Sequence, residues 1–342
     1  MGIPTSPAAL AAAAPTRESL NAAANDACAR ARGLTFALLL VATAMVGSVF
    51  LLLPAAVVLL PFGAVESYRA CAAGVRWWWF SFAAAAVEVV GGVRYEISGP
   101  DVAADHAADA AVLVVCNHHC RLDWLYLWAV AARHDRAGGV HITLKDGLRH
   151  VPLFGWAMQA FGFAFLSRGD RAADVDALGR SLAAAAAAGP CWALIFPEGT
   201  DLSPSNVEKS RAFGRTLRPP VAWDRVLVPR AAGVAAAVRA LGEDLDAVYD
   251  ATISYDGLAG RPDEAGLLRG AFPATVRVRV DRTSSHDLPR AVRVGDPSAT
   301  KLWLFEKWAH KEKHLAQGGD AAAPLPETET RARDARLHVA AG

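Results

Sequence analysis

The sequence has few of the features that mark several common protein classes. Five cysteines occur among 342 residues and form no CxxC pair, so neither a disulfide framework nor a zinc ribbon is indicated. Lysine and arginine number 35 against 34 acidic residues, a formal net charge of +1, which argues against a nucleic-acid partner. No GxSxG segment occurs, so the nucleophile elbow of a lipid hydrolase is missing.

Charged residues are also absent from a long stretch near the N-terminus, between Gly33 and Ala64. Residues 33–53 alone are long enough to cross a hydrocarbon layer of about 30 Å as a helix, and they predict a membrane anchor. Pro54 and Pro61 interrupt the apolar residues beyond this segment, which therefore either complete a tilted span or turn back.

A second apolar stretch, residues 77–93, begins with three tryptophans and contains Glu88. It is short for a span, and we expect it either to cross the membrane or to lie flat on its surface. Residues 33–95 are therefore expected to anchor the chain. The alanine-rich residues 1–32 and the Gly-, Ala-, Pro- and charge-rich residues 317–342 are expected to be disordered tails.

The intervening residues 96–316 alternate short apolar runs with helical stretches, which predicts an α/β domain with a largely buried sheet. The last expected helix, 301–315, suits either a membrane surface or packing on the domain. Strands are predicted at 111–115, 141–144, 162–166, 192–196, 226–229, 247–256 and 274–281, and helices at 121–134, 171–188 and 231–240.

One short segment, CNHHCRLDW (residues 116–124), holds two histidines, two cysteines, an arginine and an aspartate directly after an apolar strand. Adjacent side chains such as His118, His119 and Cys120 diverge, so a zinc site is not indicated, and nothing marks a thiol as activated. Five helical positions rotate a side chain by about 140°, so His118 and Asp123 converge only if the histidine lies in the turn before the helix. A carboxylate beside the ring is what a histidine general base requires.

Further motifs occur in order along the chain, at the spacing of four sequence blocks of the glycerolipid acyltransferases. The chain is similar to the lysophosphatidic acid acyltransferase type, and less general segments resemble the lysocardiolipin and lysophosphatidylinositol acyltransferase branch. The similarity covers roughly residues 40–315. The blocks are Asn117-His118 with Asp123, FLSR (165–168), FPEGT (196–200) and VPR (228–230); the less general segments are 123–128, 155–159, 196–203, 208–213 and 245–255.

The resemblance implies an acyltransferase-like catalytic domain over residues 96–316, with a mixed sheet flanked by helices and preceded by membrane-anchoring helices. It further implies direct transfer of an acyl group from acyl-CoA, as co-substrate, to a free hydroxyl of a lysophospholipid, without another cofactor. The expected partners are these two substrates and the lipid bilayer. The implied location is integral to the membrane of the endoplasmic reticulum or a related endomembrane.

The same resemblance assigns roles to individual residues and no metal ligand. His118 would remove the hydroxyl proton while Asp123 orients its ring. A membrane-bound scaffold that binds lipid without turnover is the alternative, and it offers no chemical reason to keep these side chains. The acceptor or its phosphate would be bound by Asn117, Arg168, Glu198, Gly199 and Thr200, and Pro229 and Arg230 would contact acyl-CoA or support the site.

Overall fold

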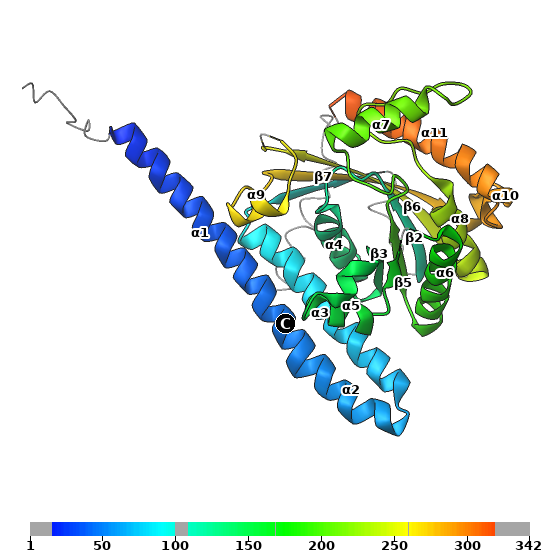
Figure 1. Ribbon diagram of the computed structural model, residues 1–342, viewed down its shortest axis with the longest axis horizontal. Coiled ribbons are helices and arrows are strands. Elements are labelled where there is room, and N and C mark those ends of the chain that lie inside the picture. Colours follow the sequence, from blue (N-terminus) through cyan, green and yellow to red (C-terminus); the bar gives the residue numbers. More distant parts are fainter. Residues whose placement is uncertain (1–15, 100–108, 168, 259, 319–342) are drawn as a thin grey trace, which may run out of the picture.

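The uncharged N-terminal stretch folds into a long helical run that turns back on itself (Figure 1). A computed structural model describes residues 16–99, 109–167, 169–258 and 260–318. The run comprises α1 (Arg17–Met45), the π-helical η1 (Val46–Leu52), α2 (Leu53–Leu59) and η2 (Leu60–Phe62), and the chain returns in α3 (Val65–Val89). The reversal uses Gly63, whose φ of 73° favours glycine. Of the described helices, Leu20–Phe62 is the candidate membrane span by length and composition.

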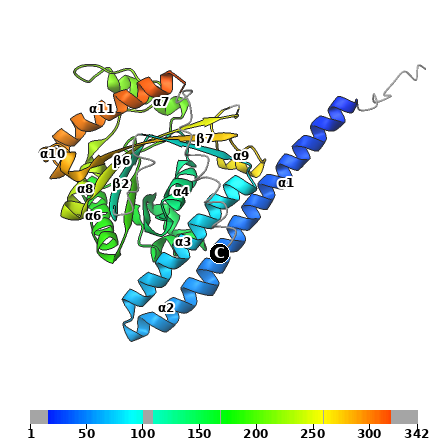
Figure 2. The ribbon, with the colours of Figure 1, turned by 180° about the vertical axis from the view of Figure 1, so that it is seen from behind.

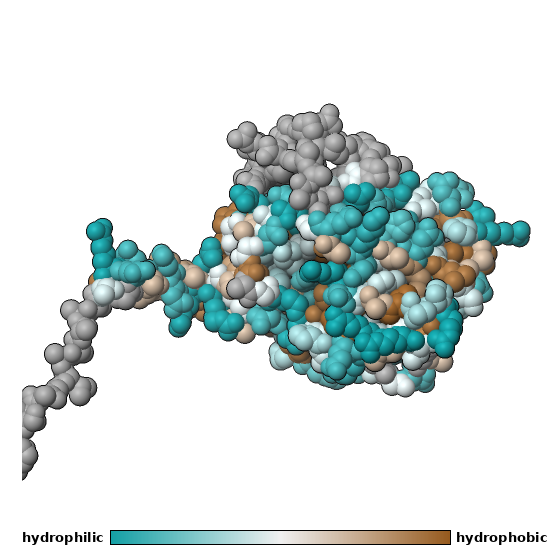
Figure 3. Space-filling model, turned by 90° about the horizontal axis from the view of Figure 1, so that it is seen from above, coloured by the Kyte–Doolittle hydropathy of each residue, from teal (hydrophilic) through white to brown (hydrophobic). Residues whose placement is uncertain are grey.

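The start of α1 corrects the expectation of disorder over residues 1–32, because residues 17–32 are helical. Alanine-rich sequence favours helix, and the helix is fixed where Arg32 Nη2 donates to the Gly270 carbonyl at 2.7 Å. The first turns project from the domain and carry a mixture of hydrophilic and apolar side chains (Figure 3). Residues 1–15 and 319–342 lie outside the described part of the chain, so the rest of the two tails stays untested.

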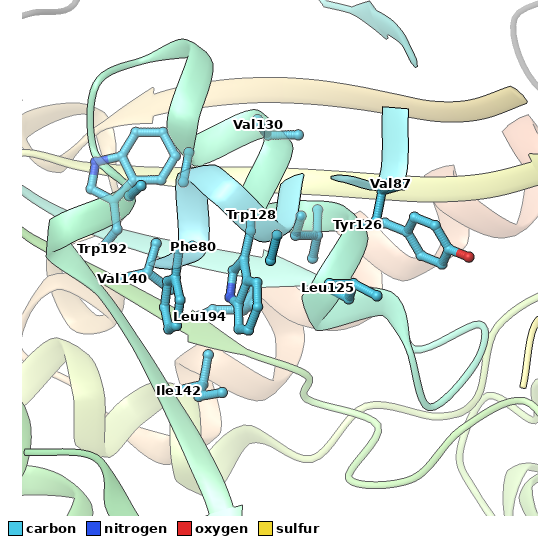
Figure 4. Packing of buried hydrophobic residues seen from close by; sticks show 14 of the residues in the cluster. Phe80, Val87, Leu125, Tyr126, Trp128, Val130, Val140, Ile142, Trp192 and Leu194 are labelled. Carbon is cyan, nitrogen blue, oxygen red and sulfur yellow. The ribbon is translucent and has the colours of Figure 1, made fainter. Parts of the chain in front are cut away.

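The second apolar stretch is a core helix of the domain, which corrects its assignment to the anchor and places the domain boundary before residue 95. Within α3, Phe80 and Val87 are fully buried. Phe80 stacks on Trp128 of α4 (Asp123–Arg133) with ring centroids 3.8 Å apart (Figure 4). An Ala- and Trp-rich helix that is apolar on most sides suits a protein core as well as a bilayer.

A buried cation also joins α3 to the domain. The guanidinium of Arg76 donates to the carbonyl oxygens of Gly138 at 2.7 Å and Phe161 at 2.9 Å. It also lies 3.0 Å from Nε2 of His141, whose Nδ1 is 2.8 Å from the Gly139 carbonyl. The Nδ1–H tautomer satisfies both contacts, and burial lowers the pKa of His141 to about 3. The ring is therefore a neutral acceptor for Arg76.

Within the described part of the chain, seven strands form one mixed sheet in the order β1-β7-β6-β2-β5-β3-β4. The last five in this order run parallel, while β7 and β1 run in the opposite direction. The predicted mixed sheet is confirmed. The bounds are β1 (Arg94–Ser98), β2 (Ala111–Cys116), β3 (Val140–Lys145), β4 (Ala164–Leu166), β5 (Cys191–Ile195), β6 (Ala247–Asp256) and β7 (Thr275–Ser284).

Helices cover both faces of the sheet (Figures 1 and 2). Val112 and Val114 of β2 pack into the cluster that contains α3 and α4. The alternate residues Leu113 and Val115 pack against α6, α8 and α11 on the other face, as the two-residue repeat of a strand requires. The second-face helices are α6 (Arg171–Ala188), α8 (Ala231–Leu241) and α11 (Pro297–Ala316).

The last long helix, α11, packs on the domain, which is the second of the two expected arrangements, since Trp303, Leu304 and Trp308 are buried there. The remaining elements are short. They are η3 (Ala137–Gly139), η4 (Asp146–His150), α5 (Phe154–Ala160), α7 (Pro204–Gly214), η5 (Gly242–Asp244), α9 (Glu264–Leu268), η6 (Ser285–Asp287) and α10 (Arg290–Arg293).

The strand predicted at 226–229 is wrong, because these residues form no strand and pair with no described strand. Their backbone N–H groups bond to side chains instead. Glu312 of α11 accepts from Val226 at 3.1 Å and Ser210 Oγ accepts from Val228 at 2.8 Å. The segment ends at Pro229, which has no N–H to donate.

The contact between α1 and the turn after α9 gives a stability prediction. A Cβ on Gly33 would lie 2.3 Å from the Leu267 carbonyl oxygen and 2.5 Å from the Gly270 nitrogen, both backbone atoms. Gly33→Ala should therefore lower the free energy of unfolding by about 1 to 3 kcal/mol. Gly74→Ala is the control, since a Cβ on this helical glycine of α3 meets nothing within 4 Å and should stabilise by up to about 1 kcal/mol.

Thermal unfolding in detergent micelles measures both changes. Equal midpoints for the two variants would show that α1 does not dock at Gly33.

Candidate active site

The predicted convergence of His118 and Asp123 is confirmed. His118 lies in the turn after β2, Asp123 is the first residue of α4, and Nδ1 of the ring is 2.9 Å from Oδ2 of the carboxylate. The histidine side chain is 17 % exposed and the aspartate side chain 0 %. When Nδ1 carries the proton bonded to the carboxylate, Nε2 is the nitrogen that can accept another.

Asp123 is buried but well bonded. Its oxygens accept hydrogen bonds from the backbone N–H of Cys120 at 3.0 Å and the hydroxyl of Tyr255 at 2.5 Å. The Cys120 thiol lies 3.2 Å from Oδ1. Tyr255 was not predicted from the sequence, although its place at the end of β6, next to β2, is the signal that could have identified it.

The imidazole ring also has a packing partner from the neighbouring strand. Phe196, directly after β5, stacks on His118 with ring centroids 4.3 Å apart and planes inclined by 20°. In addition, the carbonyl of His118 accepts a hydrogen bond from the backbone N–H of Leu202 at 2.9 Å. The ring is thus held on one edge by a carboxylate and on one face by an aromatic side chain.

The third and fourth sequence blocks meet at the same end of the sheet. Gly199 has a φ of 73°, and a Cβ added to it would lie 3.6 Å from Nη1 of Arg230. The backbone N–H of Arg230 donates to the Pro197 carbonyl at 2.8 Å. Thr200 Oγ1 accepts from Asn206 at 2.8 Å. Arg230 is exposed beside this turn, whereas Pro229 is buried.

Glu198 departs from its expected role as an acceptor contact. Its side chain is buried, with the residue 2 % exposed, and Oε1 accepts a hydrogen bond from Trp308 Nε1 at 2.9 Å. Burial raises the pKa of Glu198 to about 8, against the opposing effect of the Trp308 bond. In this conformation the carboxyl group is closed to a ligand in solution.

Asn117 and Arg168 were also predicted to contact the acceptor. Asn117 is buried, and its side chain makes two hydrogen bonds to the backbone of β6. Nδ2 donates to the Ile253 carbonyl at 3.1 Å and Oδ1 accepts from the Ile253 N–H at 2.8 Å. Asn117 thus ties the end of β2 to β6, and its expected contact with the acceptor stays a prediction. Arg168 lies outside the described residues, so its expected phosphate contact stays a prediction.

The cysteines around the site are poor nucleophiles. Cys116 and Cys120 are buried, and burial raises the pKa of both thiols, that of Cys116 well above its ordinary value. A thiol that resists ionisation lacks the reactive thiolate form. The geometry is thus consistent with a histidine base, while it disfavours a cysteine nucleophile at either position.

Comparison with known proteins shows that this chain is similar to acyltransferases. A family model described as "Acyltransferase" matches residues 94–256. Lysocardiolipin acyltransferase 1 of Mus musculus is 32 % identical over 291 residues, covering 83 % of this chain and 73 % of that protein.

Two further relatives differ in the acceptor that their names give. A probable 1-acyl-sn-glycerol-3-phosphate acyltransferase 5 of Arabidopsis thaliana is 29 % identical over 287 residues, covering 83 % of this chain and 72 % of the relative. The 2-acyl-1-lysophosphatidylinositol acyltransferase of Saccharomyces cerevisiae is 25 % identical over 261 residues, covering 64 % of each chain.

The raised pKa of Glu198 predicts how stability depends on pH. An unfolded glutamate has a pKa of about 4.3, so between there and about 8 the folded protein holds a proton that the unfolded chain has released. This group's contribution to the unfolding free energy is present at low pH and falls by about 1.4 kcal/mol per pH unit as pH rises through that window. Glu198→Gln should gain relative stability from pH 5 to pH 8.

Unfolding midpoints in micelles at several pH values test this, with Glu306→Gln, an exposed glutamate of the same helix as Trp308, as the control. Parallel pH profiles for the native protein and Glu198→Gln would contradict the prediction.

Proposed function

The chain belongs to the acyltransferase family, and we propose that it transfers a fatty acyl chain from acyl-CoA to a free hydroxyl of a lysophospholipid. The relatives support an acyltransferase of phospholipid synthesis or remodelling, since the mouse, plant and yeast proteins are named for lysocardiolipin, 1-acylglycerol-3-phosphate and lysophosphatidylinositol. These acceptors share a glycerophospholipid backbone in which an acylation position of the glycerol carries a free hydroxyl. We propose that acceptor class for this chain.

The contact between His118 and Asp123 carries the proposal. Nε2 of His118 takes the proton of the acceptor hydroxyl as its oxygen attacks the thioester carbonyl. The new ester C–O bond forms, the C–S bond breaks, and the proton passes from His118 to the departing CoA thiolate. This direct transfer requires no covalent acyl-enzyme and no metal or further cofactor.

Asp123 makes this step possible by fixing the ring and stabilising its charged form. The carboxylate lies beside Nδ1, so Nε2 remains the basic nitrogen, and the imidazolium formed during attack is next to a negative charge. Phe196 limits rotation of the ring by stacking on one of its faces. Both contacts reduce the reorganisation needed when the acceptor binds.

Two arginines of the sequence motif blocks suit a phosphate-bearing substrate. Arg230 is exposed next to the Gly199 turn, and Arg168 follows β4 in the sequence. A guanidinium can hold a phosphate through two parallel hydrogen bonds. We assign these two arginines to phosphate groups of the acceptor or of CoA, and Thr200 to the wall of the same site.

We also propose that the protein is integral to an endomembrane such as the endoplasmic reticulum. The helical run from Leu20 to Phe62 could span a bilayer. Many of its large apolar side chains are exposed, among them Leu38, Phe50, Val57 and Phe62, and exposed apolar surface of this extent is stable when lipid covers it. The hairpin with α3 would hold the catalytic domain against its lipid substrates.

Substitution of His118 tests the base directly. His118→Ala should lower acyl transfer by about 10²- to 10⁴-fold, the contribution of a general base, with expression and membrane insertion unchanged. Asp123→Asn should also be severe, because an amide cannot stabilise the imidazolium. Purified protein in micelles, labelled oleoyl-CoA and a panel of lysophospholipids provide the assay.

The matched controls are His119→Ala, which removes the neighbouring imidazole, and Cys116→Ser, which removes a thiol; both should keep substantial activity. A Cys116→Ser enzyme as inactive as His118→Ala, or an acyl-thioester trapped on that cysteine, would overturn direct transfer.

The membrane assignment has its own test. Because Leu20–Phe62 is long and apolar enough to cross a bilayer, the protein should sediment with membranes and resist release by high salt or carbonate, yet dissolve in detergent. Release by carbonate would contradict integral insertion and leave the acyltransferase proposal unaffected.

A further inference from the structure

Strand β6 extends past the end of its neighbour β2, toward the turn that contains the proposed base. β2 ends at Cys116, which lies opposite Ala251, whereas β6 continues beyond this pair and is held there by β7. Ala251, Ile253 and Tyr255 share one face of the strand, because side chains alternate along it. Tyr255 therefore lies beyond the end of β2, on the face of the sheet that α4 covers.

Two hydrogen bonds fix this part of β6. The Asn117 side chain donates to the Ile253 carbonyl and accepts from the Ile253 N–H. Because Asn117 is the first residue after β2, the start of the active-site turn holds the strand two residues before Tyr255. The tyrosine ring is also packed, with the ring centroids of Tyr126 and His119 each 5.2 Å away. Tyr255 thus has a well-defined position beside the turn.

The hydroxyl of Tyr255 donates to the oxygen of Asp123 that does not bond the histidine. It lies 2.5 Å from Oδ1, whereas Nδ1 of His118 lies 2.9 Å from Oδ2. Among the described residues, Oδ1 is otherwise bonded by Cys120 alone, through its backbone N–H at 3.2 Å and its weakly donating thiol at 3.2 Å. Burial and the nearby charge of Asp123 raise the pKa of Tyr255 well above its ordinary value, so the hydroxyl remains a donor at neutral pH.

We propose that Tyr255 is a positioning residue for acyl transfer, which keeps the Asp123 carboxylate charged and turned toward His118. The inference rests on the proposed function for the role of His118. The side chain of Asp123 is 0 % exposed, and a carboxylate without solvent needs donors to stay ionised. Its terminal torsion is also soft, so a strong bond to the far oxygen limits rotation away from the ring. Tyr255 acts through Asp123 and does not itself contact the acceptor.

Removal of the hydroxyl tests this role by turnover. Tyr255→Phe keeps the ring but removes the donor, and it should lower kcat per folded molecule by about tenfold or more. The KM values for lysophospholipid and acyl-CoA should stay within about twofold, since a positioning residue touches neither substrate. In an Asp123→Asn protein the same change should have little further effect, because the hydroxyl acts through the carboxylate.

The pH profile separates this role from simple packing. His118 and Asp123 take up a proton as a unit, and a donor to the carboxylate favours the form without that proton. Tyr255→Phe should therefore move the acid limb of kcat/KM to higher pH, by about half a pH unit or more. The other ionisable groups around the pair are unchanged in this variant; they are Cys116, His119, Cys120, Tyr126 and Glu198, with Arg225 and Arg261 near His119.

Tyr126→Phe is the matched control. Tyr126 is buried and its ring lies against Tyr255, but its hydroxyl has no hydrogen-bond partner within the described part of the chain. This variant should keep its kcat and its acid limb. Two outcomes overturn the inference: both tyrosine variants lower kcat equally without moving the acid limb, or Tyr255→Phe raises the KM for lysophospholipid more than about tenfold with kcat unchanged.

Modification of His118 by diethyl pyrocarbonate over a series of pH values, located by tandem mass spectrometry, tests the pair without turnover, because the reagent attacks the neutral imidazole. Tyr255→Phe should move the midpoint of this modification to higher pH by about half a pH unit or more, and Tyr126→Phe should not. An unchanged midpoint in Tyr255→Phe overturns the inference even if activity falls. A native protein that transfers no acyl group to any lysophospholipid counts against the proposed function, and the midpoint still decides whether Tyr255 acts on the pair.

Discussion

The buried carboxylate of Asp123 is the constraint on which the rest of the site depends. A carboxylate without solvent contact is costly unless it is bonded, and its partners come from two places: the turn with His118 and Cys120, and Tyr255 at the end of β6. The site therefore requires β6 to lie parallel beside β2, with Cys116 opposite Ala251. The same contacts of Asp123 therefore fix both the position of β6 in the sheet and the orientation of the histidine ring.

Two buried carboxyl groups near the histidine have different surroundings and suit different tasks. Asp123 accepts several good hydrogen bonds close to the ring, whereas Glu198 has one strong donor, Trp308, and a pKa raised by burial to about 8. Such separation of environments commonly separates roles within an active site. Here Asp123 contacts the histidine ring, whereas Glu198 bonds to Trp308 of α11.

The sequence predicted the local features well, because they depend on neighbours along the chain. The helix at 171–188, the strand at 247–256 and the approach of His118 to Asp123 follow from apolar period and helical rotation. Prediction from the sequence failed where the residue that makes the contact lies far away along the chain. Glu198 meets a donor 110 residues away, and the segment at 226–229 loses its strand pairing to side chains of α7 and α11. For α3, the Trp- and Ala-rich pattern is equally compatible with a helix in a lipid bilayer and with a helix in a protein core, so the sequence did not distinguish the two.

Arg76 carries a consequence for the order of events during synthesis. Its carbonyl partners lie 62 and 85 residues later in the chain, and the ring that stacks on Phe80 belongs to Trp128. A ribosome thus completes the whole hairpin well before any of these partners exists. Throughout that interval the guanidinium must stay hydrated and the aromatic face must stay uncovered, so α3 is the element most in need of protection by a chaperone or the membrane surface while translation continues.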